Sequence, residues 1–505
     1  MNLKAIIYIL GWILKIEGAF MLLPALVGFI YKETQGLAFL ITALICIFTG
    51  ILITHKKPKN TTLFAREGFI ITSATWIIMS FFGALPFVIN GDIPHFTNAL
   101  FEAVSGFTTT GASIIDDLES VSHASLFWRS FTHWIGGMGV LVFLLAIVPM
   151  TDGTPMHIMR AESPGPSVDK LLPKLKQTAF VLYAIYFLLT ITEFILLILG
   201  KMPLFDAITL TLGTAGTGGF GIKSDSIASY TPYQQWIIGI FMMLFGVNFG
   251  FYFLLLAKKF RQAFSFEEVR NYIFIIICAT TIIMLSFIGG DYLNDMTFTE
   301  KLRHSFFQVA SIITTTGYST LDYDILWPEL AKVVIVIIMF IGACAGSTGG
   351  GIKISRITIL YKSIKKDITL FFHPKRIVTL KNEKKPVAHE TIRSINVFIM
   401  AYTMIYAVSV LLISIDNFDF TTNFTAVAAT LNNIGPGLNQ AGPTESFSTF
   451  SGFSKYVMIF DMLAGRLEIF PMLILLSKEF WVNVFTPTKS AKVIKHTYRK
   501  ENETL

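Results

Sequence analysis

The chain has 505 residues, of which 53% are hydrophobic and 14% charged, and its formal net charge is +7 at pH 7. A mean hydropathy of +0.63 excludes a soluble globular protein and predicts an integral membrane protein. The positive charge is not a nucleic-acid signal, because the lysines and arginines concentrate in alternate loops between apolar segments. Cys46, Cys278 and Cys344 lie in apolar segments without metal-ligand spacing, and we assign them no function.

The first two apolar stretches, 5–31 and 36–54, are long enough to span a bilayer and contain no Thr/Gly-rich motif. We predict an accessory transmembrane hairpin within residues 1–58. The first stretch contains charged residues and lacks a small-residue cleavage pattern, so we expect a retained helix rather than a signal peptide.

From residue 59 onward one pattern recurs four times, at intervals of roughly 100 to 120 residues. Each copy has a full span, an apolar segment too short to cross, a Thr/Gly run, a polar loop and a second span. Such repetition predicts four units around one central pore in an all-α membrane protein. The runs are TTTGAS at 108–113, TGGFG at 217–221, TTTGYS at 314–319 and NNIGPG at 432–437.

The expected elements can be placed for each copy. The repeats occupy 59–150, 151–258, 259–385 and 386–485, and residues 486–505 form a tail. The full spans are expected at 69–90, 178–200, 271–289 and 392–415, the short segments at 96–107, 203–216, 299–314 and 419–432, and the second spans at 125–149, 233–257, 329 to about 371, and 454–480. We expect the short segments to be half-helices that point their partially negative C-terminal ends at the axis.

The Thr/Gly runs suit a cation path. Irregular backbone survives at membrane depth only where it is buried in protein or lines a watery path. Glycine allows backbone angles that turn carbonyl oxygens toward the axis, and four such strands form rings that replace a cation's water shell. The alternative is that the runs are ordinary turns. The predicted filter consists of Thr109, Thr110, Gly111, Thr217, Gly218, Gly219, Thr315, Thr316, Gly317, Asn433, Ile434 and Gly435.

Loop charges predict the orientation. The loops between repeats carry most of the lysines and arginines, including a cluster over 362–393, so they and both termini are expected in the cytoplasm. The opposite loops carry acidic residues such as Asp116, Asp322 and Asp324. These either attract cations to the outer mouth or are simply solvated carboxylates.

Four unequal filters fused in one chain, together with GACAGSTGGGIK at 342–353 inside a span, resemble the Trk/Ktr/HKT superfamily of potassium transporters. The resemblance covers about 60–480, and the extra N-terminal hairpin makes the chain more similar to the TrkH type than to the shorter KtrB type. In plant relatives that resemble this superfamily, serine at the first filter glycine accompanies sodium selectivity. Gly111 therefore favours potassium.

The glycine-rich part of that span is expected to open into a loop. Each glycine in a helix interior costs about 1 kcal/mol relative to alanine. In TrkH-like proteins the matching segment is an intramembrane gate beneath the filter; close helix packing by small residues is the alternative. The predicted gate residues are Gly346, Ser347, Thr348, Gly349, Gly350 and Gly351.

Arg466 is a charged residue in mid-span, which usually faces a cavity or a partner. In TrkH-like proteins an arginine of this motif projects into the pore and opposes cation passage. The alternative is a structural ion pair with Glu468 or Asp461, and both roles can hold together.

The leading hypothesis is potassium uptake across the bacterial cytoplasmic membrane, with potassium bound at the filter as substrate. A sodium-permeable or ion-coupled symporter of the same architecture and a solute transporter with broken helices remain alternatives. We predict no enzymatic activity and no bound cofactor; His133 and His157 lack ligand spacing, and no nucleotide fingerprint is present. The resemblance implies a homodimer and a cytosolic TrkA-like nucleotide-binding subunit on the basic loops, where anionic-lipid contact is the alternative.

Overall fold

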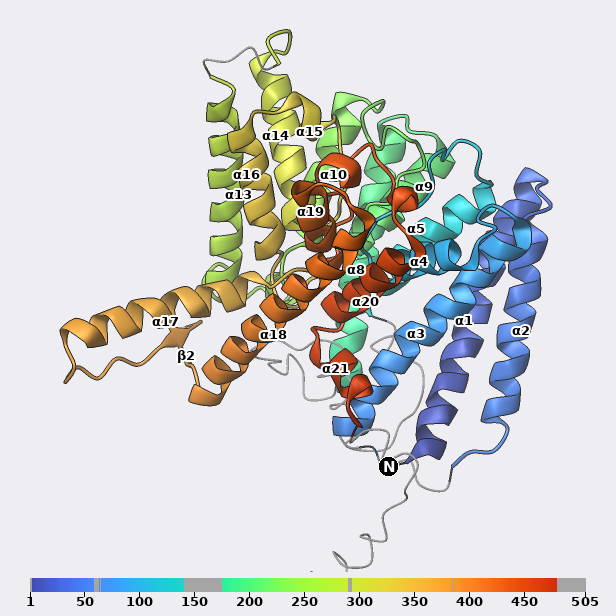
Figure 1. Ribbon diagram of the computed structural model, residues 1–505, viewed down its shortest axis with the longest axis horizontal. Helices are drawn as coiled ribbons and strands as arrows, with labels where there is room; N and C mark the ends of the chain where they lie inside the picture. The colour runs from blue at the N-terminus through green and yellow to red at the C-terminus, as the bar shows by residue number, and fades with distance from the viewer. Residues whose placement is uncertain are drawn as a thin grey trace, which may run out of the picture.

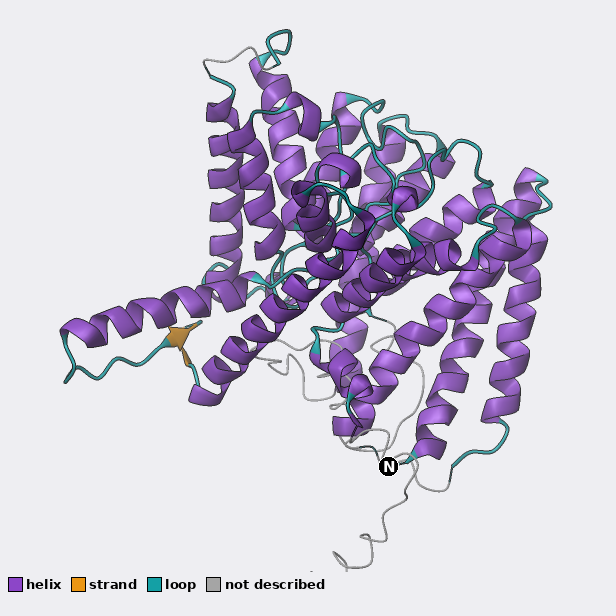
Figure 2. Cartoon of the chain, in the orientation of Figure 1, coloured by secondary structure: helices purple, strands orange, loops and turns teal. Residues whose placement is uncertain are grey.

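The computed structural model describes residues 2–58, 63, 65–139, 175–288, 293–383 and 385–478. These residues are almost entirely helical, as Figure 2 shows. The strands of the described part, β1 (Lys381–Asn382) and β2 (Lys385–Pro386), pair in one antiparallel hairpin. Six of the described helices are long and apolar enough to cross a membrane. The predicted all-α membrane fold is therefore confirmed.

The N-terminal hairpin consists of α1 (Leu3–Tyr31) and α2 (Gly36–Thr54), close to the predicted bounds. It packs beside α3 (Ala65–Asn90) and α5 (His123–Met138) of the first repeat, at the right of Figure 1. Glu33, in the turn between the two helices, accepts hydrogen bonds from the backbone N–H groups of His123 (3.1 Å) and Ala124 (3.3 Å). The turn thereby satisfies free N–H groups at the start of α5 and fixes the hairpin to the repeat.

Four copies of one helical unit follow the hairpin (Figure 1). In each, a long helix leads to a short helix, a non-helical loop and an inner helix. The long helices are α3 (Ala65–Asn90), α8 (Leu175–Leu199), α13 (Glu267–Ser286) and α18 (His389–Ile413), the short helices are α4 (Phe96–Phe107), α9 (Leu204–Gly216), α14 (Phe298–Ile313) and α19 (Phe420–Leu431), and the inner helices begin with α5 (His123–Met138), α10 (Pro232–Phe245), α16 (Glu329–Ile341) and α20 (Gly452–Arg466).

The short helices are too short to cross a bilayer. The longest has 16 residues, which at about 1.5 Å per residue gives roughly 24 Å, less than the hydrocarbon thickness of about 30 Å. Two of them, α14 and α19, carry capping side chains at their N-terminal ends. Thr297 and Glu300 form a reciprocal capping box at the start of α14, and the Asp419 side chain accepts from the backbone of Thr422 in α19.

The expectation of continuous second spans is wrong for the second and fourth repeats. The second repeat breaks between α10 and α11 (Phe249–Leu256), which are bent by 91°. There the Asn248 side chain accepts from the backbone N–H of Gly250 at 2.8 Å and caps α11. The fourth repeat breaks after α20, where Glu468 and Ile469 have positive φ angles of 55° and 71°, and α21 (Phe470–Leu476) follows.

The third inner helix ends at Ile341, and a non-helical loop over 342–353 leads to α17 (Ile354–Phe372), which leaves the bundle sideways in Figure 1. The observed loop, 342–353, is longer than the predicted gate segment, 346–351. Residues 140–149 of the second span of the first repeat, the whole of 151–174 and the tail at 486–505 lie outside the described residues. The remaining short elements are α12 (Phe260–Ala263), α15 (Tyr323–Leu326), η1 (Ser414–Asp416), η2 (Asn439–Ala441) and η3 (Phe447–Thr449).

Candidate functional site

All four short helices end in the same backbone motif. A residue in the left-handed conformation donates its N–H to the carbonyl three residues back, at 2.9 to 3.2 Å, and the next residue donates to the carbonyl five residues back, at 2.8 to 2.9 Å. This is the Schellman ending of a helix. In each helix the left-handed residue lies two positions before the predicted filter glycine, so the proposed alignment of the four repeats is structurally correct. The left-handed residues are Thr109 (φ 56°), Thr217 (52°), Thr315 (58°) and Asn433 (56°).

Threonine in these positions is strained. A β-branched residue with positive φ is an outlier, and such a backbone costs on the order of 1–3 kcal/mol at each position. Glycine would adopt the same angles without that cost. The three threonines and Asn433 are completely buried, and the repetition of one strained conformation at four equivalent places is typical of a functional constraint.

The four glycine loops form a closed ring. Each glycine has a positive φ, between 79° and 102°, and its Cα faces a carbonyl oxygen of the next loop around the axis. The ring therefore runs through the loops in chain order and returns to the first. A methyl group placed on Gly111 would lie 2.0 Å from the Gly218 oxygen, on Gly219 1.7 Å from that of Thr316, on Gly317 2.1 Å from that of Ile434, and on Gly435 2.9 Å from that of Thr110.

The same four glycines line one cavity of about 320 Å³ on the side of the ring toward the acidic loops. Pro436 and the segment 442–447 complete its wall, so the fourth loop shapes the mouth differently from the others. The four glycines, which are about 100 residues apart in the sequence, therefore share one vestibule.

Side chains tie the loops together around the ring. The hydroxyls of Thr108 and Thr110 lie 2.8 Å apart, as do those of Thr314 and Thr316. The Asn433 amide donates to the Thr110 hydroxyl at 2.9 Å and joins the fourth loop to the first. The asparagine that departs from the threonine pattern thus serves as a bridge between repeats.

The predicted gate loop lies directly against the filter. Gly350 N–H donates to the Thr315 hydroxyl at 2.6 Å, and Gly351 N–H donates to the Asn432 carbonyl at 3.1 Å. A methyl group on Gly349 would lie 2.8 Å from the Thr314 carbonyl oxygen. Glycine is needed at these positions because the loop and filter backbones are in contact.

The other half of the loop is held at the break in the second repeat. Phe249 N–H donates to the Gly346 carbonyl at 2.9 Å, Thr348 N–H to the Phe245 carbonyl at 3.4 Å, and the Ser347 hydroxyl to the Cys344 carbonyl at 2.6 Å. Breaks in two different repeats therefore meet beneath the ring, and all six predicted gate residues lie there.

Arg466 joins three repeats at the same level. Its guanidinium donates to the carbonyl of Thr348 in the loop at 2.9 Å and to that of Gly137 in α5 at 3.0 Å, with a further bond to Gly136. The two acids considered as its ion-pair partners have other contacts. Glu468 pairs with Arg356, and Asp461 accepts from the Ser409 hydroxyl at 2.7 Å.

A buried ion pair behind the filter was not predicted. Arg129 Nε lies 2.7 Å from Glu102 Oε1, and both side chains are at most 1% exposed. Arg129 also donates to the Gly221 carbonyl at 3.0 Å, and Glu102 accepts from the backbone N–H of Ile114 at 2.9 Å. The pair thus connects the first two repeats behind the ring. The charge of Arg129 within a predicted span was the signal that could have pointed to a buried acidic partner.

Replacing Arg129 with alanine is expected to lower the free energy of unfolding by about 3–5 kcal/mol, because the Glu102 carboxylate would be left buried and unpaired. Thermal unfolding in detergent would measure the loss. Lys332→Ala is the matched control: it removes a contact with the largely exposed Glu329 at 3.1 Å and a longer one with Asp324 at 3.8 Å, and a loss below about 1 kcal/mol is expected because the lysine is partly exposed. Equal losses in the two variants would contradict this assignment.

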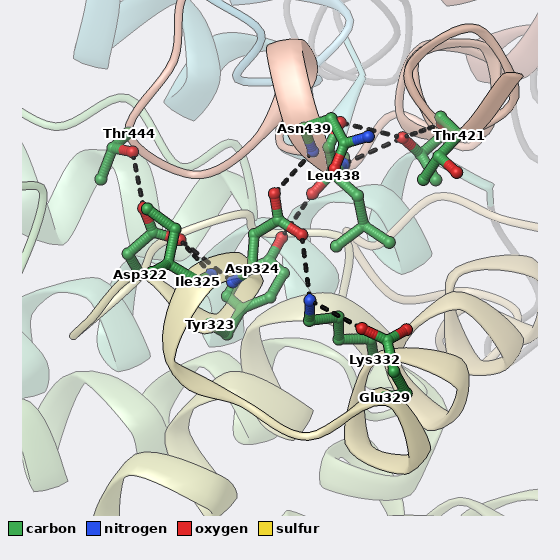
Figure 3. A network of polar contacts seen from close by, with 12 residues as sticks. Asp322, Tyr323, Asp324, Ile325, Glu329, Lys332, Thr421, Leu438, Asn439 and Thr444 are labelled. Atoms are coloured by element: carbon green, nitrogen blue, oxygen red, sulfur yellow. Dashed lines mark hydrogen bonds and ion pairs between the residues drawn. The ribbon is translucent and has the colours of Figure 1, made fainter. Parts of the chain in front are cut away.

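The outer mouth is braced by acidic side chains, as Figure 3 shows. Asp324 accepts from the backbone N–H of Asn439 at 2.7 Å, and Asp322 accepts from the Thr444 hydroxyl at 2.9 Å. The Tyr323 hydroxyl donates to the Gly437 carbonyl at 3.0 Å. These contacts fix the loop after the third filter to the loop after the fourth, so the two aspartates have a structural role.

The chain is similar in sequence and in fold to known cation transport proteins. Residues 35–482 match the family model described as TrkH, cation transport protein. The chain is 35% identical to the Trk system potassium uptake protein TrkH of Salmonella typhimurium over 487 residues, 95% of this chain and 100% of that protein. It is 35% identical to TrkG of Escherichia coli over 489 residues, 95% of this chain and 99% of the relative. The crystal structure of the potassium transporter TrkH from Vibrio parahaemolyticus is similar, with a TM-score of 0.85 at 32% identity over 95% of this chain and 100% of that chain.

Proposed function

The chain belongs to the TrkH family of cation transport proteins, and on that premise we propose that it takes up potassium through the ring of four glycine loops. The observation that carries the proposal is the closure of that ring, in which each filter glycine faces a carbonyl of the next loop. The membrane potential supplies about 2.3 kcal/mol per charge per 100 mV for inward movement. The family is one of transporters rather than enzymes.

The residues of the ring have distinct parts in this proposal. The carbonyls of Thr110, Gly218, Thr316 and Ile434 precede the glycines and supply oxygens in place of the ion's water shell. The left-handed residues one step earlier hold the backbone in that conformation. The potassium ion is the substrate, and it binds at the filter residues of all four repeats.

The loop over 346–351 and Arg466 form the gate in this proposal. The loop contacts Thr315 and Asn432 from below, and Arg466 places a positive charge at the same level. A cation leaving the filter meets both. Movement of the loop away from the third and fourth filters would open the path.

We also propose the arrangement around this unit. Four repeats, at 59–150, 151–258, 259–385 and 386–485, follow the hairpin at 1–58, with both termini on the cytoplasmic side of the bacterial inner membrane. The membrane chain forms a homodimer, and a TrkA-like nucleotide-binding subunit docks on its basic inner loops. Crosslinking of the purified membrane chain, alone and with that subunit, tests both contacts.

The test of function is potassium and sodium flux into proteoliposomes, with and without Gly111→Ser. The unmodified chain is expected to pass potassium in preference to sodium. A Cβ at Gly111 would lie 2.0 Å from the Gly218 oxygen, so the serine must displace that carbonyl and lower the potassium-to-sodium ratio. Absence of potassium flux in the unmodified chain would contradict the proposal.

A further inference from the structure

The second filter loop lacks the side chains that hold the first and third. In those loops the threonines one and three residues before the glycine lie with their hydroxyls 2.8 Å apart. The matching positions of the second loop are Gly216 and Gly218. Without side chains there, its backbone needs support from elsewhere in the molecule.

His133 of α5 fills the vacant space. A methyl group on Gly218 would lie 2.1 Å from His133 Nδ1, and one on Gly216 would lie 2.2 Å from the His133 carbonyl oxygen. The imidazole stacks on Phe220, with ring centroids 4.2 Å apart and an angle of 21° between the planes. The histidine therefore contacts the loop on both sides of Gly219, and its side chain is fully buried.

The imidazole ring of His133 acts by shape. Neither of its nitrogens has a hydrogen-bond partner among the described residues, although leaving buried polar atoms unpaired is unfavourable. The interactions that remain are packing against glycine backbone and stacking on Phe220. A planar aromatic side chain without nitrogens would make both.

We propose that His133 is a positioning residue of the second filter loop, whose imidazole ring takes the place of the side chain missing at Gly218, while its backbone carbonyl packs against Gly216. It holds Gly218, and the Gly218 carbonyl is the one that faces Gly111 across the ring. A residue of the first repeat thus sets the position of an oxygen supplied by the second. This inference rests on the proposed potassium-uptake function.

The test is the potassium-to-sodium flux ratio of the full chain in proteoliposomes. His133→Ala is expected to lower the ratio about five- to thirtyfold, the factor that a typical packing loss produces in an equilibrium. His133→Phe is expected to keep the unmodified ratio, because it retains the stacked ring. A ratio for His133→Phe as low as that of His133→Ala would overturn the proposal, as would an unchanged ratio in His133→Ala.

Gly218→Ala provides an independent arm. Gly218 is not among the described residues with positive φ, so alanine there meets the His133 ring without adding backbone strain. The single variant should lower the ratio, and the double variant Gly218→Ala with His133→Ala should recover part of it. Absence of recovery would count against the proposal even where His133→Ala alone folds poorly.

Phe131→Ala is the matched control on the same helix. Phe131 is also buried, but its ring packs on Phe20 of the hairpin, 5.5 Å away, and on Phe127. Phe131→Ala should reduce the amount of folded protein and leave the flux ratio unchanged; a fall in the ratio equal to that of His133→Ala would overturn the proposal.

The flux assay also separates this inference from the proposed function. An unmodified chain that passes no potassium would contradict the proposed function, whereas selective flux unaffected by His133→Ala would contradict this inference alone.

Discussion

Replacing Arg466 with alanine is expected to raise potassium flux at least about tenfold, the change that corresponds to about 1.4 kcal/mol in a barrier. The guanidinium places a positive charge beneath the filter and donates to the Thr348 carbonyl of the gate loop at 2.9 Å and to the Gly137 carbonyl at 3.0 Å. The substitution removes both the charge and the link that holds the loop to the first repeat. Flux into proteoliposomes at equal protein loading measures the effect.

Arg466→Lys separates the two causes. A lysine keeps the charge but lacks the planar fork that reaches two carbonyls on different repeats. If the charge opposes the cation, flux through the lysine variant stays low; if the link holds the loop closed, the lysine variant resembles the alanine variant. Unchanged flux in Arg466→Ala would remove this residue from the gate.

The repeat and its glycines could be predicted from the sequence because their chemistry is local. A helix that ends in a Schellman motif before a glycine with positive φ leaves a short sequence pattern, and that pattern recurs in all four copies. The left-handed conformation of Thr109, Thr217 and Thr315 could not be predicted, because β-branched residues disfavour it. Only the ring, which forms from segments about 100 residues apart, imposes it.

The partners of buried charges were beyond sequence reasoning for a different reason. Arg466 binds carbonyls, which every residue carries, so no spacing in the sequence points to Thr348 or Gly137. Arg129 and Glu102 face one another from different helices. The break between α10 and α11 was missed because one glycine and one asparagine interrupt an otherwise continuous apolar run, and the bond from Phe249 to the gate loop decides the conformation.

Replacing Gly219 with alanine is expected to lower potassium flux about a hundredfold or more, the factor that corresponds to about 2.7 kcal/mol. Gly219 has a φ of 79°, which alanine adopts only with strain. A Cβ there would lie 1.7 Å from the Thr316 carbonyl oxygen. The substitution must therefore push apart the second and third loops, and two of the four oxygens of that layer move away from the axis.

Gly91→Ala is the control that separates the effect of the clash within the filter ring from the effect of backbone strain. Gly91 has a similar φ of 84°, but a Cβ there would meet nothing within 4 Å. We expect Gly91→Ala to reduce thermal stability modestly and to leave flux per folded protein unchanged. If the two variants lost flux equally, strain alone would explain the result, and the contact between Gly219 and the Thr316 carbonyl would have no special role. A large loss confined to Gly219→Ala requires the two loops to meet at the path of the ion.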